Sequence, residues 1–169
     1  MKQLLTALML CGALLLGAKE INLYGNFAET QKNGVPKGWN FIRAKDYQPL
    51  PKFEILRENS ANILHFSDIA GKYGFRIPAK AGERVTITAK VKGKGRGWFT
   101  VEATSASGKW SGGFPIQRFP LKEEWNEAKV ELRIVDFKKI PTGKITVLFG
   151  ADNGSELFLS DLKMVSAAQ

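Results

Sequence analysis

The sequence predicts an all-β fold, a two-sheet antiparallel β-sandwich, and three observations lead to it. After the first eighteen residues, apolar side chains do not recur at helical spacing over more than a turn or two. Short runs alternate apolar and polar residues instead, which is the pattern of a strand with one buried face. Clusters of Gly, Pro and Asn separate about nine such runs, a spacing that is typical of a β-sandwich.

The clearest alternating run spans residues 83–91. Its apolar positions, every second residue from Val85 to Val91, share one face, and polar residues share the other. This pattern predicts a strand with one face in the core. The other predicted strands lie at 20–24, 52–57, 62–67, 73–78, 98–104, 127–135, 144–150 and 156–165.

Residues 1–18 have the pattern of a secretory signal peptide. A positive charge at Lys2 precedes an apolar stretch that ends in small residues at Ala18. The stretch is too short, and its flanks are wrong, for a transmembrane helix. A lipoprotein signal is the alternative, because Cys11 ends a short run that loosely resembles a lipobox. We therefore expect residues 19–169 to form one domain, secreted or periplasmic.

The composition is basic and poor in cysteine. Lysine and arginine (25) exceed aspartate and glutamate (16), for a net charge of +9. For an exported protein this favours polyanions such as acidic polysaccharides over nucleic acid, and a solvated basic surface is the other explanation. The only cysteine, Cys11, falls within the predicted signal peptide, so we expect neither a disulfide nor a thiolate metal site in the domain.

The two ends of the predicted domain carry distinctive segments. They read INLYGNFAE (21–29), VPKGWNF (35–41) and LFLSDLKM (157–164). In order and spacing these segments resemble carbohydrate-binding modules of the cellulase-C type, and residues 75–93 resemble a middle segment of the same family. The resemblance covers residues 20–165. It implies a galactose-binding-domain-like β-jelly roll whose first and last strands lie side by side.

Aromatic side chains that cannot enter the core are the candidates for binding sugar, because sugars stack on aromatic faces and bond polar side chains. In the strand that begins at Trp98, every second residue from Phe99 to Ala103 is apolar and is expected to face the core. Trp98 and Glu102 then lie on the opposite face of the strand. The alternative is that Trp98 caps the edge of the sandwich. Trp110, in a Gly- and Ser-rich loop, is the second candidate, and Tyr73 is the third.

The remaining tryptophans and the single histidine are interpreted differently. Trp39 and Trp125 match positions that pack inside in the family, so we expect both in the core. His65 stands between Leu64 and Phe66, which claim the core, so it faces the opposite way. It is either a polar contact in the binding cleft or a plain surface residue. Without a second histidine or a nucleophile motif, we expect neither a catalytic triad nor a zinc site.

The resemblance also implies a structural calcium that joins the first and last strands through oxygen ligands. Asp161 matches one aspartate of the family, and Glu29 is the residue that would supply a second carboxylate. Ser160, Asn26 and Ala28 stand where the family has acidic ligands, so the predicted ligand set is incomplete.

The function that follows is a secreted, non-catalytic carbohydrate-binding module. Its predicted groove for a polysaccharide is lined by Trp98, Trp110, Glu102, Tyr73 and His65. Two alternatives stay open: an envelope-associated interaction module without sugar affinity, and a small polysaccharide-degrading enzyme. A glycosidase needs two carboxylates at a fixed separation, and the spacing of Glu102, Glu54, Glu131 and Asp136 places no two of them together on one strand face.

Overall fold

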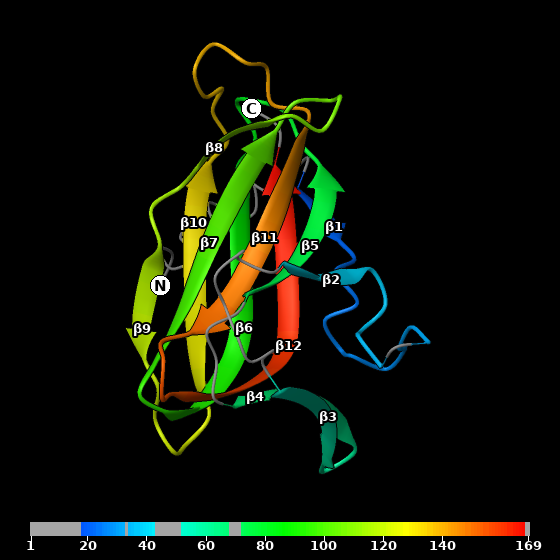
Figure 1. The fold of residues 1–169 in the computed structure, drawn as a ribbon, viewed down its shortest axis with the longest axis vertical. Coiled ribbons are helices and arrows are strands. Elements are labelled where there is room, and N and C mark those ends of the chain that lie inside the picture. The colour runs from blue at the N-terminus through cyan, green and yellow to red at the C-terminus, as the bar shows by residue number, and fades with distance from the viewer. Residues whose placement is uncertain (1–17, 33, 43–51, 68–71, 168–169) are drawn as a thin grey trace, which may run out of the picture.

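The computed structural model describes residues 18–32, 34–42, 52–67 and 72–167. Within these ranges every regular element is a strand, and the strands form two antiparallel sheets that pack face to face (Figure 1). The predicted all-β sandwich with jelly-roll topology is confirmed. Of the predicted signal peptide, all but Ala18 lies outside the described residues.

The first sheet, called sheet I, contains both the first and the last strand. Its members are β1 (Ala18–Ile21), β3 (Lys52–Glu58), β4 (Ala61–Ser67), β6 (Arg84–Lys94), β10 (Asn126–Arg133) and β12 (Glu156–Ala167). Their order is β10-β6-β12-β4-β3, and β1 also pairs with β12. The β3–β4 hairpin is attached to β12 through only three residue pairs, from Leu157 to Leu159.

The second sheet, called sheet II, faces the first across the core. Its members are β2 (Trp39–Ile42), β5 (Lys72–Pro78), β7 (Arg96–Thr104), β8 (Trp110–Gly113), β9 (Gln117–Pro120) and β11 (Lys144–Ala151). Their order is β2-β5-β11-β7-β8, with β9 also on β7. Strands β8 and β9 pair with opposite ends of β7, and residues 114–116 connect them (Figure 1).

Apolar residues from both sheets fill the space between them, and Trp39 is among the most deeply buried. Its side chain is 0% exposed, and its ring contacts Phe27 and Phe149 at centroid distances of 5.9 and 5.7 Å. The indole Nε1–H donates to the carbonyl of Leu23 at 2.9 Å, so the polar atom of this core residue is satisfied. The prediction that Trp39 packs in the core is confirmed.

The two ends of the domain meet at a bulge in β12. The register of β12 against β6 shifts between Ser160 and Lys163, where Asp161 adopts a φ of 49°. There the amide of Leu162 donates to the carbonyl of Gly25 at 3.3 Å. A side chain on Gly25 would overlap the carbonyl of Leu162, so only glycine permits this approach. The first and last strands lie side by side, as predicted.

Some element boundaries differ from the prediction. The first strand lies at Ala18–Ile21 rather than 20–24, and the strand predicted at 127–135 ends at Arg133. The sequence analysis did not predict β8 and β9 as strands. Each is four residues long and itself contains Gly or Pro, so it has too few alternations to be distinguished from a loop.

Candidate functional site

The face of sheet II that points away from the core carries the candidate site. Along β7, Phe99 and Val101 are buried in the core, whereas Trp98, Thr100 and Glu102 are partly exposed on the other side. The predicted alternation of this strand is confirmed. A large aromatic residue therefore stands on the outer face of sheet II among polar neighbours.

Trp98 is held against the backbone of the neighbouring strand. It lies directly opposite Gly150 of β11, and a side chain built on Gly150 would overlap the six-membered ring of Trp98. Glycine thus provides the space in which the indole rests on the sheet. This contact fixes the ring while leaving part of its surface accessible.

Polar side chains form a row across the same face, further along the strands. Arg76, Thr146 and Glu102 are aligned in register on β5, β11 and β7. The Nε–H of Arg76 donates to the hydroxyl of Thr146 at 3.5 Å. Thr146 and its neighbour Leu148 on the central strand are buried, so the accessible groups of this face come mainly from the flanking strands.

A second strand brings a cation beside Trp98. Arg118 of β9 is the register partner of Trp98, and directly paired residues of antiparallel strands place their side chains on the same face. The Nε atoms of Arg96 and Arg118 lie 3.1 and 3.6 Å from the two carboxylate oxygens of Asp152. The sequence analysis did not single out these residues, because their proximity depends on the pairing of β9 with β7.

Trp110 lies at the opposite end of β7 from Trp98. It pairs with Thr104, six residues beyond Trp98, which corresponds to roughly 20 Å of strand. The residue is 54% exposed, and the ammonium of Lys138 lies 5.0 Å from its ring centroid. The two tryptophans therefore stand at opposite ends of β7, and their shared part in binding stays a prediction.

His65 lies on the outer face of sheet I, so it cannot share a groove with Trp98 on the outer face of sheet II. Its Nδ1 is 2.8 Å from Glu54 and its Nε2 is 2.9 Å from Glu156, while its ring stacks on Phe158 at 4.2 Å. Both ring nitrogens are engaged by carboxylates from β3 and β12. The predicted role of His65 in the same cleft is wrong, because the two residues belong to different sheets.

The row of side chains around His65 continues to Trp125. The ammonium of Lys92 lies 4.7 Å from the ring centroid of Trp125 and 5.5 Å from that of Phe158, and it pairs with Glu58 at 2.8 Å. Trp125 is partly exposed and packs under this cation. The prediction of a core Trp125 is therefore wrong. The row connects the ends of four strands on sheet I through paired charges.

Tyr73 falls where the structure describes only the backbone. Its backbone pairs with Phe149 of β11, and its side chain lies outside the described residues. Its predicted part in binding stays a prediction.

The two predicted calcium ligands are each occupied by a lysine. Asp161 pairs with Lys90 at 2.8 Å and Glu29 pairs with Lys37 at 2.6 Å, and the hydrogen bonds that the two lysines donate to these carboxylates raise the pKa of both lysines. Within the described ranges no group of three or more metal-binding side chains occurs. This arrangement does not fit a calcium ion unless both lysines move away, and calcium binding stays a prediction.

Comparisons with known proteins identify the fold. No family model matches the sequence, and no curated protein matches it. Among solved structures, a family 4 carbohydrate-binding module aligns with 86% of this chain and 98% of its own, at a TM-score of 0.58 and 14% identity. The family 11 carbohydrate-binding module from Clostridium thermocellum was solved in complex with a β-1,3-1,4-mixed-linked tetrasaccharide. It aligns with 90% of this chain and 98% of its own, at a TM-score of 0.55 and 12% identity.

The chain has the β-sandwich fold of carbohydrate-binding modules. A cyclase from Fischerella sp. TAU aligns over 90% of this chain and 100% of its own, at a TM-score of 0.57 and 11% identity. Structures described as carbohydrate-binding modules and a structure described as a cyclase therefore share this fold. The function has to be argued from the site. In the described part of the chain, no helix is long and apolar enough to cross a membrane.

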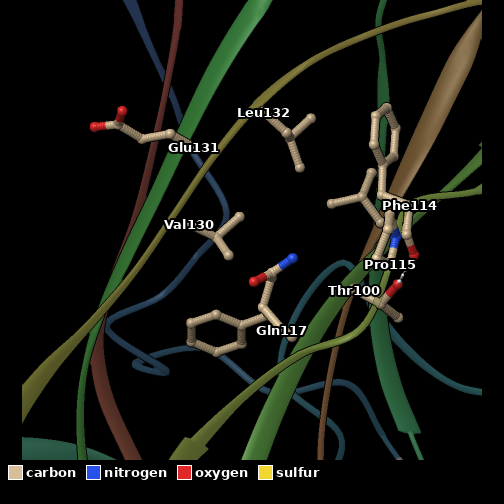
Figure 2. Close-up of a pocket in the computed structure, with 9 residues that line it drawn as sticks. Thr100, Phe114, Pro115, Gln117, Val130, Glu131 and Leu132 are labelled. Carbon is tan, nitrogen blue, oxygen red and sulfur yellow. Dashed lines mark hydrogen bonds between the residues drawn. The ribbon is translucent and has the colours of Figure 1, made fainter.

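A side cavity of about 220 Å³ opens between the two sheets, and Figure 2 shows the residues around it. Its floor is formed by core residues of β7 and β10, Phe99, Val101 and Val130. At its rim, Glu131 pairs with Lys129 at 2.6 Å, and this hydrogen bond lowers the pKa of Glu131. The cavity thus combines an apolar floor with the polar side chains of Thr100 and Gln117 and the paired carboxylate of Glu131. The outer face of sheet II offers more groups suited to sugar hydroxyls.

Proposed function

We propose that this chain is a secreted or periplasmic, non-catalytic carbohydrate-binding domain that binds a polysaccharide on the outer face of sheet II. The observation that carries the proposal is the position of Trp98, an accessible aromatic ring held on a polar sheet face by its contact with Gly150. The fold shared with carbohydrate-binding modules supports it. The signal-peptide pattern of residues 1–18 supports export.

The chemistry of this face suits an extended sugar chain. An indole face stacks on the C–H surface of a pyranose ring, and polar side chains orient the ring through its hydroxyls. Glu102 lies four residues beyond Trp98 along β7, about 13 Å away, and Arg76 is in register with Glu102 across β11. A ligand that contacts Trp98 and this polar row spans several sugar units. A longer chain would also reach Trp110.

Binding without catalysis is supported by the arrangement of the carboxylates. Glu54 and Glu156 face each other across His65, but the imidazole ring fills the gap in which a glycosidase would hold its substrate. Glu102 stands on the opposite sheet from both. The proposal therefore assigns no catalytic residue.

A protein-interaction module is the second candidate. Trp110 and Ile116 are 54% and 46% exposed, and both lie on the edge formed by β8, β9 and their connection. Exposed large apolar residues of this kind mark contact surfaces when they are contiguous. This alternative places the functional surface at the edge of sheet II rather than on its outer face.

Affinity electrophoresis against neutral and acidic polysaccharides tests the proposal, with acidic polymers included because the net charge is +9. The wild-type protein should be retarded by at least one polymer. Trp98→Ala should lose this retardation while keeping its far-UV spectrum. Trp110→Ala should still be retarded, and short oligosaccharides should compete with the polymer for it as they do for the wild type, because only a longer chain reaches Trp110. If Trp98→Ala is folded and still retarded, the binding face is wrong. If no polymer retards the wild-type protein, the interaction module is favoured.

A further inference from the structure

The surface beside Trp98 carries two arginines that share one carboxylate. Arg96 precedes Trp98 by two residues on β7, and Arg118 is the register partner of Trp98 on β9. Both guanidinium groups approach Asp152, which follows β11 directly. Two positive charges and one negative charge leave a net positive site at the edge of the proposed sugar platform.

The two arginines are held to different degrees. Arg96 is anchored, since its Nε lies 3.1 Å from Asp152 and its backbone bonds both Asp152 and the hydroxyl of Ser155. The Nε of Arg118 is 3.6 Å from Asp152, beyond the range of a hydrogen bond, and both side chains are accessible, at 52% exposure for Arg118 and 67% for Arg96. Arg118 thus has a guanidinium that a ligand can engage without first breaking a strong bond.

We propose that Arg118, supported by Arg96 and Asp152, forms a subsite for the carboxylate of an acidic sugar stacked on Trp98. The inference rests on the proposed function and names the class of ligand, a polysaccharide that contains uronic acid. Directly paired residues have Cβ atoms about 5 Å apart, so a pyranose ring on the indole places its substituents within reach of the Arg118 side chain.

The carboxylate is favoured by the shape and solvation of the guanidinium. A planar guanidinium donates two parallel hydrogen bonds to the two oxygens of a planar carboxylate, whereas a neutral hydroxymethyl group offers one uncharged oxygen that does not match this geometry. Asp152 holds Arg96 in place, and its negative charge lowers the net positive charge of the subsite. Because the remaining charge is small, charge alone does not attract every polyanion to this subsite. The subsite therefore predicts a preference for the acidic form of a given polymer over its neutral form.

The experiment compares each acidic polymer with its own carboxyl-reduced form. Polygalacturonate, alginate and glucuronoxylan are used as such and after chemical reduction of the uronic acids to neutral sugars, and dissociation constants are measured by affinity electrophoresis. The wild-type protein should bind at least one acidic polymer about ten- to a hundredfold more tightly than its reduced form. Arg118→Gln should reduce this preference to less than about threefold, because the affinity for the acidic polymer should fall much more than the affinity for the reduced polymer.

Arg133→Gln is the matched control, because it removes the same charge from an exposed arginine on sheet I. It should keep the preference of the wild type. The inference is overturned if Arg133→Gln loses the preference as Arg118→Gln does, if Arg118→Gln keeps it, or if dextran sulfate binds in the same Arg118-dependent way. If the wild type binds reduced and acidic polymers equally and Trp98→Ala abolishes both, the inference fails while the proposed function stands. If the wild type binds neither form of any polymer, both fail.

Discussion

Trp98 and Gly150 are directly opposed residues of β7 and β11, and the indole ring lies where any side chain at position 150 would stand. The ring is therefore supported from below by the backbone of the central strand of sheet II. This support favours binding, because an unsupported indole would lose rotamer freedom when a ligand orders it, and that loss would weaken the affinity.

Gly150→Val should displace the Trp98 ring and weaken polysaccharide binding at least tenfold, with an overpacking cost of about 1–3 kcal/mol in the free energy of unfolding. Affinity electrophoresis and the near-UV spectrum of the tryptophans measure the two effects. Gly113→Ala is the control on the same face, because a Cβ there meets its nearest atom at 3.4 Å. Unchanged binding by a folded Gly150→Val protein would contradict the role of this contact.

Trp39→Ala should be far more destabilising than Trp98→Ala. Trp39 is 0% exposed and donates to the carbonyl of Leu23, so truncation leaves a cavity and an unpaired acceptor, at a cost of about 3–5 kcal/mol. Chemical denaturation measures the difference between the two variants. Trp39→Phe should recover part of the loss, since it keeps one aromatic ring while it removes the donor and part of the buried volume. Equal costs for Trp39→Ala and Trp98→Ala would show that Trp98 is also a core residue.

His65→Ala should destabilise the protein without changing polysaccharide binding. The substitution removes two contacts to carboxylates and the stack on Phe158, and the β3–β4 hairpin pairs with β12 over only three residues. Because Glu54 and Glu156 are largely exposed, we expect a loss of only about 1–2 kcal/mol. His65→Phe retains the stack and should lose less. A folded His65→Ala protein that no longer binds polysaccharide would place the binding site on sheet I.

Removal of calcium should leave the melting temperature of the wild-type protein unchanged. A ligand that binds only the folded state stabilises it by mass action, but here Lys90 and Lys37 occupy the carboxylates of Asp161 and Glu29. Thermal denaturation with calcium and with a chelator measures the effect. The double variant Lys37→Met, Lys90→Met frees both carboxylates and shows whether a site is latent. A calcium-dependent rise in the wild type would support the ion that the family resemblance implies.

Local alternation predicted much of the fold and part of the candidate site. The core side of β7 and the outward direction of His65 follow from residue types within a few positions, whereas the burial of Trp39 was predicted from the family resemblance. The strands β8 and β9 were not predicted, because four residues that include Gly or Pro show no clear alternation. Trp125 was misassigned because a match to a family position that packs inside does not show that Lys92, rather than the core, covers this ring.

The amino-acid sequence by itself determined which side of its strand each residue occupies, since side chains alternate with a period of two whatever the strand pairs with. Only the tertiary structure decided which residues share a surface. Trp98 and His65 both point away from the core, yet β7 joins sheet II and β4 joins sheet I, so they lie on opposite faces of the molecule. The pairing of β9 with β7 likewise brings Arg118 beside Trp98. Strand pairing depends on hydrogen bonds between segments distant in the chain, and no local pattern records it.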